Sequence, residues 1–135
     1  MTDPDPAPPR LILLAEDDDD VALVASRILE QAGHRVVRAA TADDVLPLLI
    51  REQPELLLLD VMMPSEEGLD GFDICRRIRE SATHRNLPIV MLSAIAEGTG
   101  KSEEQMRRAT NADAYLHKPF EAQRLLETIA PLLGR

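Results

Sequence analysis

Carboxylates gather where two apolar segments of the chain end. The run Leu11–Ala15 stops at Glu16 and Asp17. A second run, Leu56–Leu59, follows Glu55 and stops at Asp60. Unbroken apolar runs of this length are typical of strands buried on both faces of a parallel sheet. If these strands are neighbours, the three carboxylates converge, and a divalent cation would relieve their repulsion. An all-oxygen ligand set suits Mg²⁺ better than zinc or copper.

Two other polar residues follow predicted strands. Ser93 ends the apolar segment 88–92, and Lys118 follows the segment 113–117. Taken singly, such a hydroxyl is usually a turn residue and such a lysine a solvated charge. At the same sheet edge as the acids, they would supply a hydroxyl donor and a fixed cation. Phosphoryl transfer needs such groups because it depends mostly on positioning and charge neutralisation. Asp60 would then be the nucleophile that becomes an aspartyl phosphate.

The elements that position these residues alternate along the chain. Apolar residues recur at helical spacing over 21–32, 45–49, 71–82 and 120–133, a strand is predicted over 34–40, and a further helix opens at Ser102. This order predicts an α/β fold, a flavodoxin-like, doubly wound five-stranded parallel sheet with strand order 2-1-3-4-5 and five helices. Thr41 is expected to cap the second helix, and Pro47 to kink it.

Length and composition limit the classes of protein. The 135 residues suit one domain, 10–135, after an acidic, proline-rich tail, 1–9. A net charge of −9 and only three aromatic residues argue against a nucleic-acid partner. Because no apolar run reaches membrane-spanning length, we expect no membrane contact and a cytoplasmic location. The single cysteine, Cys75, excludes a disulfide within the chain and is expected in the core.

A second phosphate motif competes with the acid cluster. The segment 98–102 resembles the end of a P-loop, with Lys101 as the phosphate-binding lysine. Ile95, however, stands where the motif requires glycine. Ser102 and Gln105 also suit a helix capping box. A small P-loop-like nucleotide-binding protein therefore remains only an unfavoured alternative.

Taken together, the chain resembles a response-regulator receiver domain of two-component signalling, of the stand-alone, CheY-like kind. Four separated motifs, each at the end of its own predicted strand, carry the resemblance: residues 12–18, 56–64, 88–94 and 115–120. Four motifs in order are a more specific signal than any one of them.

The resemblance implies roles in phosphate acceptance. Asp60 would be the phosphoacceptor, supplied by a histidine kinase or a phosphotransfer protein. Asp17 and Asp60 would bind Mg²⁺ directly, Glu16 through a water, and the backbone carbonyl of Met62 would complete the protein ligands. The resemblance implies a phosphoacceptor signalling protein rather than an enzyme, although such a domain can catalyse its own phosphorylation and dephosphorylation.

The resemblance also implies how the signal leaves the pocket. Lys118 would hold the phosphoryl oxygens, after a cis peptide between Lys118 and Pro119. Ser93 would move to bond the phosphate and Tyr115 would turn inward, so that the last helices change shape for a downstream protein partner that the sequence does not name. We expect a monomer or weak dimer, and no output module in a chain whose last helical pattern runs almost to its end.

Two loops depart from the family pattern. Residues 65–71 and 95–101 each lie in a loop about three residues longer than usual. In the first, Gly68 and Gly71 compete for the usual place of a glycine before a hydrophobic residue, and spacing to the next strand favours Gly71. Asn111 stands where glycine is usual in the family, a mild change because asparagine tolerates a positive φ. The long loops leave open a phosphorylation-independent pseudo-receiver that acts as a scaffold.

Overall fold

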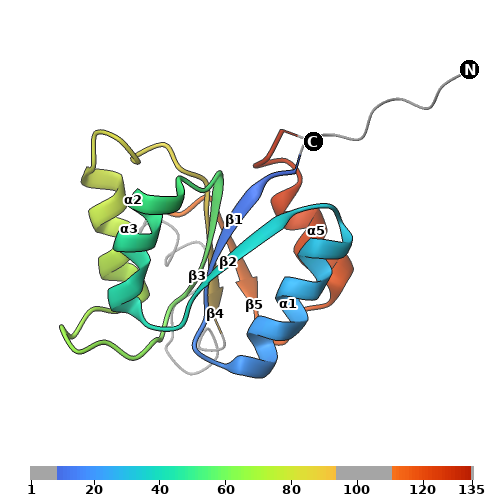
Figure 1. The fold of residues 1–135 in the computed structure, drawn as a ribbon, viewed down its shortest axis with the longest axis horizontal. Helices are drawn as coiled ribbons and strands as arrows, with labels where there is room; N and C mark the ends of the chain where they lie inside the picture. The colour runs from blue at the N-terminus through green and yellow to red at the C-terminus, as the bar shows by residue number, and fades with distance from the viewer. Residues whose placement is uncertain (1–8, 94–110, 135) are drawn as a thin grey trace, which may run out of the picture.

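The computed structural model describes residues 9–93 and 111–134. Five parallel strands form one sheet in the order β2-β1-β3-β4-β5, which confirms the predicted flavodoxin-like fold (Figure 1). The strands are β1 Leu11–Ala15, β2 Arg35–Ala39, β3 Leu56–Asp60, β4 Ile89–Ser93 and β5 Ala114–His117. Each strand is four or five residues long, as the short apolar runs predict.

Helices connect the strands. They are α1 Asp19–Gln31, the short 3₁₀ helix η1 Ala42–Asp44, α2 Val45–Glu52, α3 Gly71–Glu80 and α5 Ala122–Ile129. Three predicted features lie outside the described residues: positions 1–8 of the tail predicted over 1–9, the loop 95–101 with its P-loop-like segment, and the helix expected at Ser102. Over the described ranges, no helix has the length and apolarity needed to span a membrane.

Two apolar cores lie on opposite faces of the sheet. Side chains of a strand alternate between the faces, so Leu57 and Leu59 of β3 pack on the α2 and α3 side, while Leu56 and Leu58 pack on the α1 and α5 side (Figure 1). All five residues of β3 are buried. Cys75 lies in the first core, as expected, and burial raises the pKa of its thiol to about 11.

Acidic residues begin α1. The Asp18 carboxylate accepts hydrogen bonds from the backbone N–H groups of Asp20 and Val21, at 2.9 and 3.1 Å. Asp19 and Asp20 occupy the first turn, where the helix dipole favours negative charge. Much of the acidic run after β1 therefore serves to start this helix.

The start of the second helix differs from the sequence prediction. The chain enters through η1, and the Thr41 hydroxyl donates to the Asp44 carboxylate at 2.9 Å instead of capping a backbone N–H. Pro47 is consequently the third residue of α2. In the first turn a helical N–H has no acceptor within its own helix, so the proline removes no bond from the interior of α2.

A single arginine ties together the amino-terminal edge of the sheet. Arg79 of α3 donates to the backbone carbonyls of Asn111, Arg85 and Leu87, at 2.7 to 3.0 Å. Its guanidinium also pairs with Asp113 at 2.8 Å. Asn111 has a φ of 61°, in the left-handed region that asparagine tolerates better than most residues.

Replacing Arg79 by Met should lower the free energy of unfolding by about 2 kcal/mol, because the partly buried carbonyls and Asp113 lose a charged donor. Urea denaturation measures this loss. Arg76→Met is the matched control on the same helix. Its exposed pair with Asp73 should contribute less than about 0.5 kcal/mol. Equal losses in the two variants would contradict the special role of Arg79.

Candidate functional site

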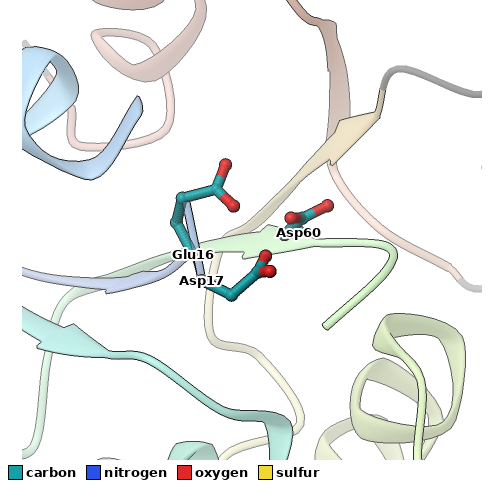
Figure 2. A group of neighbouring side chains, drawn as sticks. All are labelled: Glu16, Asp17 and Asp60. Carbon is teal, nitrogen blue, oxygen red and sulfur yellow. The ribbon is translucent and has the colours of Figure 1, made fainter. Parts of the chain in front are cut away.

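The strand register brings the predicted acids together. β1 pairs with β3 in parallel, with Ala15 opposite Leu59, so Glu16 and Asp60 follow on neighbouring strands. One carboxylate oxygen from each of Glu16, Asp17 and Asp60 lies within 4.8 Å of the others. Figure 2 shows these three side chains at the ends of β1 and β3. Glu16 and Asp60 are buried, whereas Asp17 is exposed.

Lys118 joins this cluster from the end of β5. Its ammonium group pairs with the carboxylate of Glu16 and lies 2.9 Å from Oδ2 of Asp60. Its backbone N–H donates to the carbonyl of Ser93 at 3.0 Å, so the ends of β4 and β5 are tied together. The peptide between Lys118 and Pro119 is cis, as the resemblance implies.

The Asp60 carboxylate is held on both oxygens. Lys118 donates to Oδ2, and the backbone N–H of Met62 donates to Oδ1 at 3.1 Å. Two donors therefore fix the direction in which the buried carboxylate points. The predicted role of the Met62 carbonyl as a metal ligand stays a prediction.

Lys118 pairs with two of the three carboxylates, and the protonation of Glu16 reflects this crowded, buried setting. Burial and the neighbouring Asp60 raise the pKa of Glu16 to about 7, although Lys118 opposes the shift. Burial alone would lower the pKa of Lys118, but the carboxylates of Glu16 and Asp60 raise it above its ordinary value. The lysine thus stays charged, and the excess negative charge is relieved partly by a proton on Glu16.

These donors suit a magnesium ion. The three carboxylates are hard oxygen ligands, and the exposed side of Asp17 leaves room for water molecules in the remaining coordination positions. A dication placed there would replace the proton on Glu16 as the means of balancing charge. The chemistry of the site therefore fits the ion that the sequence predicted.

The two predicted switch residues, Ser93 and Tyr115, lie on the neighbouring strands β4 and β5. Ser93 ends β4 and is 2% exposed. Tyr115 is 5% exposed and belongs to the core between the sheet and α3. Their predicted movements on phosphorylation stay predictions.

Gly71, rather than Gly68, meets the backbone below the site. A Cβ atom added to Gly71 would lie 2.6 Å from the carbonyl oxygen of Asp60 and 2.8 Å from Cα of Val61. The N–H of Gly71 donates to the Val61 carbonyl at 2.8 Å. Gly68 has open space around it and a φ of 78°. The close approach supports the sequence preference for Gly71.

The lengthened loop after β3 is anchored away from the acid cluster. The Asp43 carboxylate accepts from the Ser65 hydroxyl and from the Glu66 backbone N–H, both at 2.7 Å. Glu66 and Glu67 are exposed. Asp70 instead forms a capping box with Asp73 at the start of α3. These loop acids therefore have solvated or structural positions.

Arg38 is the site neighbour that the sequence analysis missed. It lies in β2 and donates to the backbone carbonyls of Glu16 and Asp17. In the sequence, Arg38 is visible only as an arginine near the end of a predicted strand. It can be placed beside the acidic run only when the pairing of β2 with β1 is known.

A family profile described as the response regulator receiver domain matches residues 12–130. The chain therefore belongs to the receiver domain family of two-component response regulators. Among curated proteins, it is 38% identical over 124 residues to the transcriptional regulatory protein AfsQ1 of Streptomyces coelicolor. That match covers 92% of this chain and 51% of AfsQ1, and the chain spans about half the length of the other curated relatives too.

Solved structures agree with this assignment. A response regulator from Chloroflexus aurantiacus superposes with a TM-score of 0.83 at 35% identity, covering 94% of this chain and 99% of that one. The receiver domain of a Pseudomonas aeruginosa sensor histidine kinase gives a TM-score of 0.81 at 28% identity, with coverages of 94% and 99%. That structure is described with a magnesium ion coordinated in its active site cleft.

The raised pKa of Glu16 predicts a pH dependence of stability in metal-free buffer. Between about pH 4.5 and 7, the folded protein keeps a proton on Glu16 that the unfolded chain has released. The free energy of unfolding should therefore fall as pH rises through this window, by on the order of 2 kcal/mol. Urea denaturation at several pH values, with a chelator present, measures the slope. Glu16→Gln should lack this part of the slope, and an unchanged slope would contradict the shift.

Gly71→Ala should lower the free energy of unfolding by about 3 kcal/mol, because the new methyl group overlaps the backbone of Asp60 and Val61. The amide resonances of these two residues should also move. Gly68→Ala is the matched control, and the strained φ alone should cost about 1 kcal/mol without moving those resonances. A milder effect at Gly71 than at Gly68 would refute the close approach.

Proposed function

We propose that this domain accepts a phosphoryl group on Asp60 from a phosphohistidine of a sensor kinase or phosphotransfer protein, in a Mg²⁺-dependent step. One observation carries the proposal. The buried Asp60 carboxylate is oriented by Lys118 and by the Met62 N–H, at the same edge as Glu16 and Asp17.

The transfer needs only groups that surround Asp60. An Asp60 oxygen attacks the phosphorus atom, the new O–P bond forms, and the P–N bond to the donor imidazole breaks, with its electron pair left on the nitrogen. Lys118 is already within hydrogen-bond distance of Asp60, so its ammonium group can move onto the incoming phosphoryl oxygens without leaving the site. Its raised pKa keeps it charged throughout the physiological range.

Glu16, Asp17, Asp60 and the carbonyl of Met62 are proposed to hold the Mg²⁺. When bound, the ion neutralises the negative charge that three carboxylates and a phosphoryl group bring together. The protein's own part is to keep Glu16 and Asp60 buried and pointed at one another, and to leave Asp17 open to solvent.

The phosphorylated state is proposed to be read by another protein. Ser93 lies at the end of β4 and Tyr115 lies within β5. Movements of these two side chains would carry the effect of the new charge toward α5. Relatives such as RpaA are named as DNA-binding regulators, but this chain spans only about half of that protein. For the domain itself, which we place at 10–135, the acidic composition supports a protein partner rather than nucleic acid.

Asp60→Asn should abolish labelling by acetyl phosphate and Mg²⁺, because the amide oxygen cannot replace the carboxylate as nucleophile. Phos-tag gels and intact mass spectrometry measure the product. Glu67→Gln is the matched control, since it removes an exposed loop acid and should be labelled like the wild type.

Other outcomes would select the alternatives. An Asp60→Asn protein labelled as strongly as the wild type would contradict the assignment of Asp60 as the phosphoacceptor. A wild type that takes no phosphate from any donor would favour the pseudo-receiver scaffold. Nucleotide binding that is lost in Lys101→Ala and kept in Asp60→Asn would favour the P-loop-like alternative.

A further inference from the structure

The side chain of Arg38 reaches across from β2 to the loop that follows β1. Nε donates to the carbonyl of Glu16 at 2.9 Å, and a terminal nitrogen donates to the carbonyl of Asp17 at 3.0 Å. The other terminal nitrogen pairs with the Asp19 carboxylate at 2.9 Å. One guanidinium therefore contacts three residues of the acidic run.

The two carbonyl bonds differ in kind from the ion pair. The Asp19 side chain is 90% exposed, and such a surface pair contributes little. Carbonyl groups belong to the backbone, so bonds to them fix the orientation of the peptide units on both sides of Asp17. The N–H of Glu16 donates to the carbonyl of Ala39, the residue after Arg38, at 3.0 Å, and ties the same stretch to the end of β2.

Asp17 depends on its backbone more than the other two acids do. Lys118 contacts the carboxylates of Glu16 and Asp60, both of which are buried. Within the described ranges 9–93 and 111–134, no hydrogen bond or ion pair holds the exposed carboxylate of Asp17. Its position is set by the peptide units that Arg38 binds.

We propose that Arg38 is a positioning residue for the Mg²⁺ site, which holds the backbone of Glu16 and Asp17 so that the Asp17 carboxylate faces Glu16 and Asp60. The inference rests on the proposed function, since it concerns the metal of that same site. It adds a role for Arg38, and it predicts the direction in which Mg²⁺ affinity changes when Arg38 is replaced. A positive guanidinium near a cation site disfavours the cation by simple electrostatics, so charge alone predicts tighter Mg²⁺ binding when Arg38 is removed.

Positioning predicts the opposite. Arg38→Ala should weaken Mg²⁺ binding to the unphosphorylated protein by about tenfold, as is typical when a partner that orients a metal ligand is lost. Arg38→Lys keeps the charge but cannot bond two carbonyls and the Asp19 carboxylate in the same fork geometry. It should therefore resemble Arg38→Ala. Isothermal titration calorimetry with MgCl₂ measures the affinity, and circular dichroism checks that each variant is folded.

Asp19→Asn is the matched control, because it removes the ion pair and leaves both carbonyl bonds. Its Mg²⁺ affinity should stay within about twofold of the wild type. Hydrogen exchange of the amides of residues 16–20 in metal-free buffer gives a second readout. Exchange should be faster in Arg38→Ala and Arg38→Lys than in Asp19→Asn.

The results separate the two proposals. If the wild type binds Mg²⁺ and both Arg38 variants bind it equally or more tightly, the positioning role is wrong while the proposed function stands. If the wild type binds no Mg²⁺, the proposed function and this inference both fail.

Discussion

Charge repulsion at the carboxyl edge of the sheet is the constraint around which the domain is organised. The register of β1 and β3 forces Glu16 and Asp60 together, and Lys118 offsets only part of their charge. Burial, together with the neighbouring Asp60, raises the pKa of Glu16. The negative charge that Lys118 leaves unbalanced favours a cation beside the carboxylates, and a pocket with balanced charge would attract a divalent cation less strongly.

Holding like charges in place requires a rigid support. The buried strand β3 supplies it, with apolar side chains packed on both faces of the sheet. Gly71 then lets α3 approach the backbone of Asp60 more closely than any other residue would allow. The energy that keeps the carboxylates together comes from this packing rather than from contacts among the carboxylates themselves.

The sequence predicts what depends on local pattern and on strand order. The apolar runs before Glu16 and Asp60 define central strands, and alternation along the chain then defines the sheet, so the acid cluster follows. Arg38 could not be predicted in this way, because its partners are backbone carbonyls in the loop that follows another strand. The predicted entry into α2 was wrong for a local reason: the Thr41 hydroxyl binds the Asp44 side chain, and a 3₁₀ turn places Pro47 in the first turn of the helix. Motifs reveal side-chain chemistry, whereas contacts to backbone depend on the finished fold.

The Arg79 network lies at the end of the sheet opposite the acids. The strand β4 runs five residues from one end to the other, or roughly 13 Å at the usual rise of a strand. Effects of substitutions separated by such a distance are usually additive. Substitutions in the acidic pocket and in the Arg79 network should therefore change the free energy of unfolding independently of one another. The amino-terminal end of the sheet can be stabilised or weakened without moving the carboxylates at the opposite end.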